Sequence, residues 1–429
     1  MVAVDRTTVV DRAETSEEHL VKQVPRSRVL TVAADMAVPL ATFVVASLAL
    51  LIGAAIIGAS PHVAGEVEVP NYVVRSQLSQ WEETFLAPWQ HWDGLWYLKI
   101  AAQGYDYWDH SLAFFPFYPL VVRIVGSLLH GNYLMAAVVV SVASYLVALV
   151  YLYKLARQEF DEGIARRSII YLAIFPTAFF FMAVYTESLF LALTVAAFYY
   201  ARRKRWVLVG ILGMVASLTR STGLLLVIPL LVEYLQQRQF NLREVRADIL
   251  SILVVPAGTA LYVVYNLLSF GRPTAFLEAQ DHWERALAVP WQALLDSWAL
   301  ATTDPFVPLV TPNDGSILYQ VLYLSNQPSG HVYNLVFFAL GFALMLIALK
   351  TLRPVYGLYA LLSLALPLFD PSGMAPLLSM PRFVLVVFPL FFVLARLGRN
   401  RVANWTIVVA CLVGLFFLLV RFASWYWVA

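Results

Sequence analysis

Apolar stretches about as long as a bilayer is thick recur along almost the whole chain. A helix of about 20 apolar residues crosses a membrane, and a shorter one can be stabilised inside a bundle. No part of the pattern alternates strands with helices, so no soluble strand-and-helix domain is expected. We expect an all-α polytopic membrane protein of about eleven transmembrane helices, near residues 36–58, 132–153, 168–184, 188–201, 206–219, 222–235, 248–269, 332–350, 355–369, 383–396 and 403–425.

The segment 112–129 is apolar enough to span a membrane, but it contains Pro116 and Pro119 and carries Arg123. If it crosses, every later loop changes side. The basic cluster from Arg202 to Arg205 would then lie outside, against the positive-inside rule. We therefore expect 112–129 to be a re-entrant or interfacial element.

This topology places the N-terminus in the cytoplasm and opens the larger loops on the other side. We expect a cytoplasmic tail over residues 1–30 and a single transmembrane domain over 31–429, with outer loops near 59–131 and 270–331. In the second outer loop, helical spacing of apolar residues predicts an amphipathic helix along the membrane surface. The alternative is a lid or scaffold helix without substrate contact. The apolar residues are Trp283, Leu287, Trp291, Leu294, Leu295 and Trp298.

The composition agrees with a membrane protein and narrows its chemistry. Hydrophobic residues make up 61% of the 429 positions and charged residues only 13%, too little polar surface for a soluble globule. A net charge of +2 excludes the strong basic excess of a nucleic-acid binder. The single cysteine, Cys411, allows no intramolecular disulfide or thiol–metal cluster. Residues 1–28 lack the apolar core and cleavage site of a signal peptide, so we expect the first hydrophobic helix to remain as an anchor.

The most informative polar stretch runs from His91 to Tyr105, just outside the first predicted transmembrane helix. Asp93 precedes a helical run that closes at Gly104, a favoured residue just past a helix end. An Asp in this place predicts an N-cap, where backbone N–H groups and the helix dipole favour the ionised carboxylate. Such a carboxylate suits a general base that takes a proton from a sugar hydroxyl. The alternative is that Asp93 only caps its helix.

Other polar residues of this stretch allow more than one interpretation. Lys99 and His91 flank Asp93 and could touch a donor phosphate or sugar, or be exposed bystanders. Tyr97 shares a helix face with Ile100 and Ala101, which favours packing over chemistry. No spacing matches a strong metal-ligand pattern, so we expect no metal and no cofactor. The residues that could suggest a metal are Asp106, Asp109 and His110.

Two arginines lie in predicted outer turns. Arg220 interrupts two short apolar helices, where a guanidinium is costly unless it lines an aqueous cavity or meets an anion. A phosphate fits its fork of donors, and a structural pair with Glu187 is the alternative. Arg382 follows Pro381 in a polar turn on the same predicted side. It would complete a bidentate phosphate site, with simple interfacial snorkelling as the alternative.

Five short blocks, in order along residues 91–391, resemble motifs of the PIG-V-like mannosyltransferases, the second mannosyltransferases of GPI-anchor assembly, which belong to the GT-C glycosyltransferases. The blocks are Trp92-Asp93 with Tyr97, Ile100-Ala101 and Gly104-Tyr105; Phe114-Phe115-Pro116-Phe117-Tyr118-Pro119; Phe175-Pro176 followed by Tyr185-Thr186-Glu187-Ser188-Leu189-Phe190; Thr219-Arg220-Ser221 with Gly223; and Pro381-Arg382-Phe383 followed by Phe388-Pro389-Leu390-Phe391.

The resemblance implies a GT-C-type helical bundle that moves mannose, with inversion, from a polyprenyl- or dolichyl-phosphate donor to a hydroxyl of a lipid- or glycan-linked acceptor. It would lie in the plasma membrane of a prokaryote or the endoplasmic reticulum of a eukaryote, among membrane lipids, with an extracytoplasmic active site. The family role of Glu187 stays open among binding sugar hydroxyls, orienting an arginine and capping the next helix. The implied residues are Asp93 as general base; Arg220, Arg382 and Lys99 at the donor phosphate; His91, Trp92, Tyr97, Tyr185, Glu187 and Ser188 in the sugar and acceptor cavity; and Phe115, Pro116 and Tyr118 in a lipid groove.

Two other classes of function stay open. A transporter or flippase of isoprenoid-linked lipids would also need an amphipathic groove and intramembrane arginines, with polar residues along a path to both faces. The unusual polar residues are predicted to gather on one face only, which favours an enzyme. A non-catalytic subunit of a glycosylation complex would tolerate the loss of Asp93 in a transfer assay.

Overall fold

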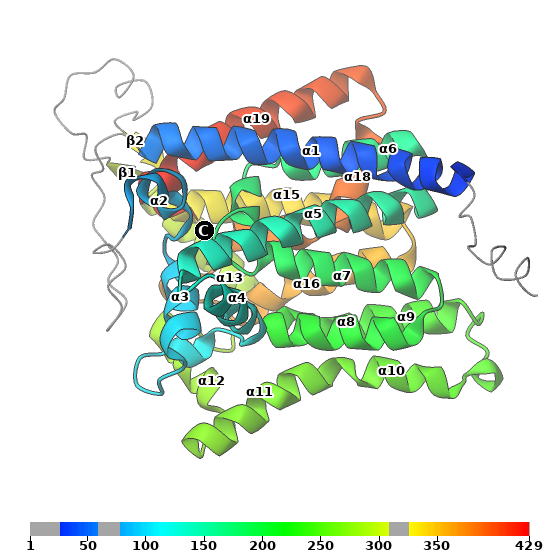
Figure 1. Ribbon diagram of the computed structural model, residues 1–429, viewed down its shortest axis with the longest axis horizontal. Helices are drawn as coiled ribbons and strands as arrows, with labels where there is room; N and C mark the ends of the chain where they lie inside the picture. Colours follow the sequence, from blue (N-terminus) through cyan, green and yellow to red (C-terminus); the bar gives the residue numbers. More distant parts are fainter. Residues whose placement is uncertain (1–25, 59–77, 309–325, 429) are drawn as a thin grey trace, which may run out of the picture.

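Long helices lie side by side along one direction and form the body of the protein (Figure 1). The computed structural model describes residues 26–58, 78–308 and 326–428. Four helices in these residues are long and apolar enough to cross a membrane. They are α1 (Arg26–Gly58), α5 (Tyr133–Glu159), α15 (Gly330–Thr351) and α19 (Arg401–Ala423).

Two further candidate spans are bent in the middle. The pair α10 (Leu250–Leu253) and α11 (Val255–Phe270) turns by 41°, and the pair α17 (Met380–Val386) and α18 (Pro389–Leu397) by 78°. A proline stands in the first turn of each second helix, Pro256 in α11 and Pro389 in α18. Because proline has no N–H and clashes with the preceding turn, a continuous helix breaks there. The predicted spans 248–269 and 383–396 are therefore present but broken.

Shorter helices fill the rest of the bundle and match several predicted spans. They are α6 (Glu162–Ala173), α7 (Glu187–Arg202), α8 (Trp206–Thr219), α9 (Val227–Gln236) and α16 (Pro354–Phe369). By length and composition, the described residues contain four spans, or six if each bent pair counts as one. The total of eleven transmembrane helices thus stays a prediction.

One predicted span, 168–184, is wrong as a continuous helix. The helix α6 begins earlier, capped by the Asp161 side chain, which accepts from the Ile164 N–H at 2.8 Å, and it ends at Ala173. A short 3-10 helix follows over Ala178–Phe181. The cause is Pro176, because the residue before a proline avoids helical backbone and proline itself cannot continue the hydrogen-bond ladder.

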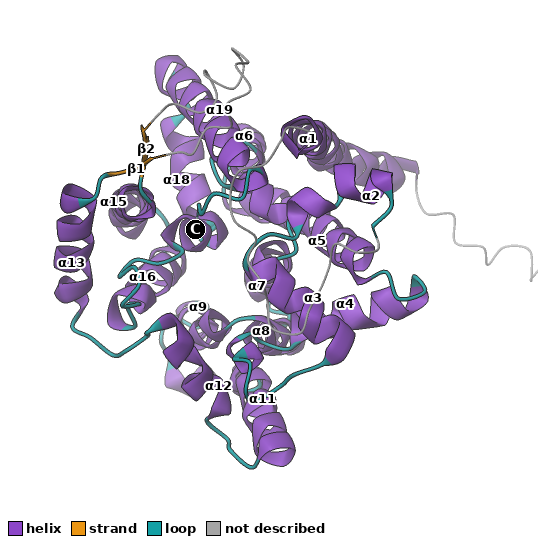
Figure 2. Cartoon of the chain, turned by 90° about the vertical axis from the view of Figure 1, so that its left-hand side faces the viewer, coloured by secondary structure: helices purple, strands orange, loops and turns teal. Residues whose placement is uncertain are grey.

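Short helices and the only two strands of the described residues gather at one end of the bundle, on the left in Figure 1. The helix α4 is seen nearly end-on in Figure 1 and lengthwise in Figure 2, so it lies across the long helices. With twelve residues it is also far shorter than the helix that a bilayer requires. The elements at this end are α2 (Gln80–Phe85), α3 (Asp93–Gln103), α4 (Phe117–Leu128), α12 (Ala275–Glu278), α13 (Pro290–Thr303), β1 (Phe306–Pro308) and β2 (Asn326–Pro328), with 3-10 helices over Ala87–Trp89, Ser111–Ala113 and Ala279–Trp283.

The geometry of α4 is what the sequence predicts for an interfacial element over 112–129.

The strands β1 and β2 pair antiparallel, with Phe306 opposite Pro328. Three more 3-10 helices lie elsewhere in the described chain, over Ser221–Leu226, Leu242–Glu244 and Ala247–Ile249.

The amphipathic helix of the second outer loop is shorter than predicted. Residues 284–288, here named the loop-2 strap, are not helical but run antiparallel to residues 369–373. The helix α13 starts only at Pro290, a residue suited to the first turn of a helix. It lies across the long helices (Figure 2) and leaves Trp291, Leu295 and Trp298 exposed on its outer surface. An apolar exposed face fits the predicted placement at a membrane surface.

Candidate active site

Asp93 occupies the first turn of α3 but does not act as its N-cap. The cap position belongs to Trp92, whose φ of 53° is unusual for a residue with a side chain, and no side-chain capping bond is present there. The predicted helix end is confirmed, since Gly104 follows α3 with a φ of 91°. A backbone hydrogen bond of 2.9 Å from the Val184 N–H to the Trp89 carbonyl ties the start of α3 to the turn before α7. The predicted N-cap role of Asp93 is therefore wrong, and its carboxylate is free to make another contact.

That contact is a chain of ion pairs that joins four distant parts of the sequence. Arg382 Nη1 donates to Asp93 Oδ2 at 2.5 Å, and Arg382 Nε donates to Glu187 Oε1 at 2.7 Å. The same Glu187 oxygen accepts from Arg220 Nη1 at 2.7 Å, and Arg220 Nη1 also donates to Thr186 Oγ1 at 3.0 Å. The order along the chain of contacts is thus Asp93, Arg382, Glu187, Arg220.

Helix ends position all four side chains. Glu187 is the first residue of α7, and Arg220 is the C-cap residue of α8. Arg382 lies in the first turn of α17, after Ser379 in left-handed backbone conformation, and Asp93 opens α3. The breaks between short helices therefore bring four charged residues to one place.

Burial differs along the chain of ion pairs. The Glu187 side chain is 0% exposed and Arg382 6%, whereas Asp93 is 20% exposed. Burial of Arg382 among carboxylates contradicts interfacial snorkelling. Arg220 does form the predicted alternative pair with Glu187, yet it belongs to the same cluster as Arg382. Because buried charges are costly unless paired, this arrangement must be satisfied internally, and two carboxylates balance two guanidinium groups.

Asp93 faces a cavity of about 430 Å³ at the end of the bundle that carries the short helices. Of the four residues in the ion-pair chain, Asp93 is the one that lines it. Tryptophan rings form much of the wall, together with two histidines and apolar side chains. The lining residues are Trp92, Asp93, Trp96, His282, Trp283, Gly330, His331, Asn334, Met374, Ala375, Leu378 and Trp427.

His91, Trp92 and Tyr185 surround the start of α3. The buried His91 ring contacts Trp425 with ring centroids 3.9 Å apart, and its Nδ1 lies 2.7 Å from the Phe422 carbonyl oxygen. The Tyr185 hydroxyl donates to the His91 carbonyl at 3.0 Å, and its ring lies 4.4 Å from the Arg382 guanidinium carbon. Trp92 lines the cavity itself. Tyr185 therefore supports both the backbone before Asp93 and the arginine that binds Asp93.

Tyr97 and Ser188 are buried behind the cavity. The Tyr97 ring contacts Phe114 and Tyr118, with centroids 5.1 and 5.2 Å away. Burial raises the pKa of Tyr97 above its usual value, and the charge of Arg220 partly opposes this rise. Ser188 is the second residue of α7, next to Glu187, and is wholly buried. These positions agree with packing support for the site.

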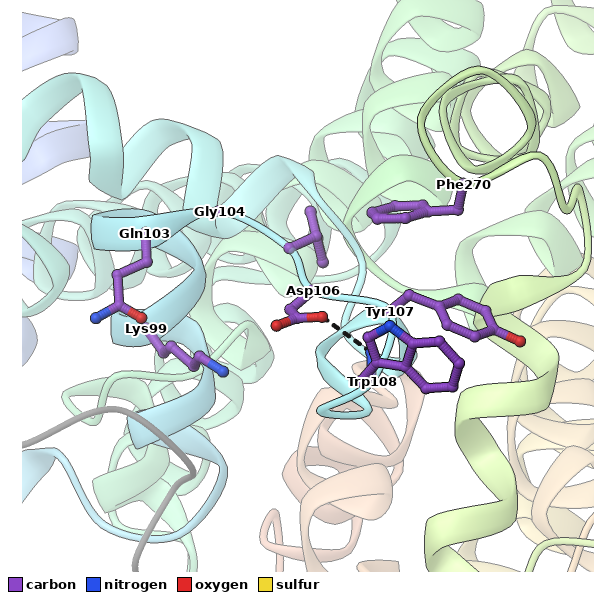
Figure 3. Close-up of a pocket in the computed structure, with 8 residues that line it drawn as sticks. Lys99, Gln103, Gly104, Asp106, Tyr107, Trp108 and Phe270 are labelled. Carbon is purple, nitrogen blue, oxygen red and sulfur yellow. Dashed lines mark hydrogen bonds between the residues drawn. The ribbon is translucent and has the colours of Figure 1, made fainter.

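Lys99 does not lie with Asp93. It forms an ion pair with Asp109, both side chains being buried. Lys99 lines a second cavity, of about 370 Å³, whose other residues are Gln103, Gly104, Tyr105, Asp106, Tyr107, Trp108 and Phe270. Figure 3 shows Lys99 and Gln103 of α3 on one side of this cavity and Tyr107 and Trp108 on the other. Burial lowers the pKa of Lys99 from its usual value, and the charge of Asp106 opposes the change.

The other two residues considered for a metal site have partners of their own. Asp106 Oδ1 accepts from the Trp108 N–H at 3.0 Å, and the His110 ring stacks on His282 with centroids 4.6 Å apart. Within the described residues, no group of three or more His, Cys, Asp or Glu side chains is placed to hold a metal ion.

The residues predicted for a lipid groove make packing contacts at the start of α4. Phe115 packs against Tyr262, with ring centroids 5.3 Å apart, and Pro116 is the residue before the helix. Tyr118 is fully buried, with its hydroxyl 2.8 Å from Ser141 Oγ. These three residues connect the first outer loop to α5 and α11 and do not line the cavity beside Asp93.

A second buried charged cluster lies at the opposite end of α7. Glu233 is completely buried and accepts from Arg202 Nη1 at 2.7 Å, with Arg353 Nη2 3.5 Å away. Unusual polar residues therefore occur at both ends of the bundle, and the prediction that they gather on one face is wrong. Between the two clusters, Phe198 and Tyr359 pack on Phe388 with ring centroids 5.1 and 5.4 Å away. These aromatic contacts fill part of the interior between the two clusters.

Sequence reasoning missed several residues of this site. Trp283 and Trp427 line the cavity, but only Trp283 had been singled out, as part of a helix that it does not join. Arg285, in the loop-2 strap, is close enough for the charges of Asp93 and Arg382 to affect its pKa. No local motif marks Trp283 and Arg285, because the pairing of residues 284–288 with 369–373 places them and that pairing joins distant parts of the chain.

Comparison with known proteins identifies the family. The family model described as "Mannosyltransferase (PIG-V)" matches residues 43–270, just over half of the chain. GPI mannosyltransferase 2 of Yarrowia lipolytica is 27% identical over 203 residues, which cover 46% of this chain and 54% of that protein. GPI mannosyltransferase 2 of Drosophila pseudoobscura pseudoobscura is 32% identical over 111 residues, 24% of each chain.

The chain thus spans about half the length of the first of these relatives. Among solved structures, ArnT from Cupriavidus metallidurans bound to undecaprenyl phosphate gives a TM-score of 0.49 at 15% identity, covering 86% of this chain and 62% of that chain. The family match includes the α3, α7 and α8 residues of the ion-pair chain. The chain belongs to the PIG-V mannosyltransferase family.

Proposed function

We propose that this protein is an inverting glycosyltransferase of the GT-C type. It moves mannose from a polyprenyl- or dolichyl-phosphate donor to a hydroxyl of a lipid- or glycan-linked acceptor. Membership of the mannosyltransferase family supports the reaction class. The observation that carries the proposal is the placement of Asp93, which lines a cavity of about 430 Å³ at the end of a buried chain of ion pairs.

In the proposed reaction, Asp93 is the general base. Arg382 binds Oδ2 of Asp93, and in the described residues Oδ1 makes no hydrogen bond, so one oxygen is fixed and the other can accept a proton. The acceptor hydroxyl gives its proton to Asp93 while its oxygen forms a bond to the anomeric carbon. The bond from that carbon to the phosphate oxygen breaks, and the phosphate leaves with the electron pair. One displacement of this kind inverts the anomeric centre.

The arginines would act on the leaving group. Negative charge builds up on the phosphate in the transition state, and guanidinium groups fixed beforehand stabilise it without reorganisation. Arg220 and Arg382 are both held by Glu187, whose Oε1 accepts from each. Glu187 therefore orients the two arginines in this scheme, and the reaction requires neither a nucleotide nor a metal. The packed tryptophans of the cavity can exclude water from the site.

We place this site on the extracytoplasmic side of a membrane, with the N-terminus in the cytoplasm. The basic cluster that begins at Arg202 lies at the end of α7 away from Glu187. Sixteen residues of helix separate these two ends, a distance of about 22 Å at 1.5 Å per residue. Basic clusters prefer the cytoplasmic face, which supports this orientation. The interior contacts of Phe198, Tyr359 and Phe388 between the two charged clusters favour an enzyme over a transporter or flippase.

The test uses the full chain, purified and placed in lipid nanodiscs. It is incubated with radiolabelled polyprenyl-phosphate mannose or polyprenyl-phosphate glucose and a membrane lipid extract, and the labelled product is identified by mass. We expect a product one hexose heavier than its acceptor, formed from the mannose donor. Transfer of glucose in preference to mannose, or no labelled product from either donor, would contradict the proposal.

A further inference from the structure

The proposed leaving phosphate meets a site whose own charges already cancel. Asp93 and Glu187 balance Arg220 and Arg382, and each arginine makes its ion pairs at 2.5–2.7 Å. Because a phosphate would compete with these carboxylates, tight binding requires a further cation at the cavity. The four-residue chain of ion pairs does not provide it.

The loop-2 strap, whose neighbouring residues line the cavity, carries such a cation. Trp283, immediately before the strap, lines the cavity, and Met374, just after the partner segment, lines it as well. Backbone hydrogen bonds fix the strap against residues 369–373: Ala288 N–H to the Phe369 carbonyl at 3.1 Å, Ala286 N–H to the Pro371 carbonyl at 3.3 Å, and Gly373 N–H to the Glu284 carbonyl at 2.9 Å. Ser372 Oγ also donates to the Trp283 carbonyl at 2.6 Å. Arg285 stands in the middle of this ladder, opposite Ser372.

The guanidinium of Arg285 is mostly enclosed but only loosely paired. Nη1 donates to the Asp370 carbonyl at 3.0 Å, whereas the Asp370 carboxylate oxygen Oδ2 is 3.6 Å away. The Arg285 side chain is 18% exposed and that of Asp370 is 42% exposed. An exposed carboxylate at this distance is screened by water and holds its partner weakly. Within the described chain, Nε and Nη2 of Arg285 make no hydrogen bond.

Arg285 is also within electrostatic reach of the proposed catalytic residues. Burial lowers the pKa of Arg285 from its usual value, the carboxylates of Asp370 and Asp93 oppose this, and Arg382 adds to it. The group stays protonated, as arginine does in proteins.

We propose that Arg285 binds the phosphate of the lipid-linked donor, as a third guanidinium beside Arg220 and Arg382. This inference rests on the proposed transfer reaction. The loop-2 strap holds the backbone of Arg285, and the unused Nε and Nη2 present a planar fork suited to phosphate oxygens. With Arg285, the site gains a cation whose carboxylate partner, Asp370, is itself exposed to water. The second outer loop thereby contributes to donor binding through a specific residue.

The test measures the binding of polyprenyl phosphate to the full chain in nanodiscs, with uncharged polyprenol of the same length as a second probe. The variants are R285Q and R285K, and the matched control is R272Q. Arg272 belongs to the same outer loop, is exposed and pairs with Glu278 at 3.2 Å, away from the cavity. Thermal unfolding and gel filtration show which variants fold.

We expect R285Q to weaken polyprenyl-phosphate binding about tenfold or more, as for the loss of a charge-assisted hydrogen bond. R285K should weaken it several-fold, because a lysine offers no fork, and R272Q should leave it unchanged. Polyprenol should bind equally to all four proteins. R285K alone decides the matter if R285Q does not fold.

Two results would overturn the assignment. One is unchanged polyprenyl-phosphate affinity in R285Q, or in R285K where R285Q does not fold. The other is an equal loss of polyprenol binding, which would show a structural effect of the strap. Binding does not depend on turnover, so the two proposals fail separately. Absence of mannose transfer by the wild type contradicts the proposed function, whereas unchanged binding in an active enzyme contradicts only the role of Arg285.

Discussion

Glu187→Gln is the most informative perturbation of the ion-pair chain. The substitution keeps the shape of the side chain and removes the charge that both Arg220 and Arg382 share through Oε1. Glu187 is completely buried, so water cannot replace the lost charge at that point. Removing one partner of a buried ion pair costs about 3–5 kcal/mol. Arg382 keeps its bond to Asp93, so the loss falls mainly on Arg220 and the expected cost lies near the lower end, about 3 kcal/mol.

The assay follows thermal unfolding in nanodiscs, with and without polyprenyl phosphate. A loss of this size should lower the unfolding midpoint by several degrees. A phosphate that binds beside Arg220 and Arg382 supplies the missing charge, so polyprenyl phosphate should raise the midpoint of E187Q more than that of the wild type. A ligand at a hundred times its Kd stabilises a folded protein by about 2.7 kcal/mol, so most of the loss can be restored.

The chain offers a matched control in Glu233→Gln. Glu233 is also completely buried between two arginines, Arg202 and Arg353, but at the other end of α7. E233Q should lose less stability, because Arg202 keeps its ion pair with Glu159, and should respond to polyprenyl phosphate only as the wild type does. The reasoning would be refuted by an E187Q protein within about 0.5 kcal/mol of the wild type, or by equal rescue of E187Q and E233Q.

Two further predictions concern the surroundings of the site. Lys99→Met should reduce stability, because Asp109 is left buried without its partner. It should leave the KM for the donor within about twofold, as expected for a residue outside the donor site. A large rise in donor KM at unchanged stability would restore Lys99 to the donor site. Partial burial and the neighbouring His110 lower the pKa of His282 below its usual value. The undocked loop therefore binds more protons than the docked loop. As pH falls from about 6.5, the usual histidine value, the contact of His282 with His110 should weaken. The opening equilibrium of residues 279–283, obtained from hydrogen exchange after division by the intrinsic exchange rate at each pH, should therefore rise on acidification. This pH dependence should disappear in H282Q, and the same pH dependence in H282Q would rule out this cause.

The sequence predicted which charged residues come together better than it predicted local backbone conformation. Arg220 and Arg382 were predicted to share a phosphate site, on the same outer side as Asp93, because a guanidinium in an outer turn of an apolar protein needs a partner or water. The structure brings all three together in one chain of ion pairs, in which Arg382 binds Asp93 directly and Glu187 joins the two arginines. Their chemical roles remain proposals, but their convergence needed no knowledge of the packing between helices.

Features that depend on backbone conformation or on distant pairing were not predictable in this way. Trp92 takes the cap position through a positive φ, so Asp93 enters the helix, and no side-chain pattern announces that. Lys99 shares α3 with Asp93, but it projects to another cavity and pairs with Asp109. The apolar spacing that starts at Trp283 imitates a helix, whereas pairing with residues 369–373 keeps the strap out of helical conformation.

Proline positions account for most of the differences in helix boundaries. Pro176 ends α6 early, Pro290 starts α13 late, and Pro389 bends a predicted span by 78°. A hydropathy pattern averages over such residues, because one proline hardly changes the mean hydropathy of twenty positions. Predictions that treated each proline as a break would have come closer to the observed bounds.

Single-turnover transfer by the Asp93→Asn protein, measured alongside its binding of polyprenyl phosphate, tests the central claim most directly. The substitution is expected to preserve folding, since Asp93 is the most exposed member of its ion pair, and to leave polyprenyl phosphate bound. The account predicts that mannose transfer falls by about 10²-fold to 10⁴-fold, the usual contribution of a general base. A folded, donor-binding D93N protein that transfers mannose at close to the wild-type rate would contradict it.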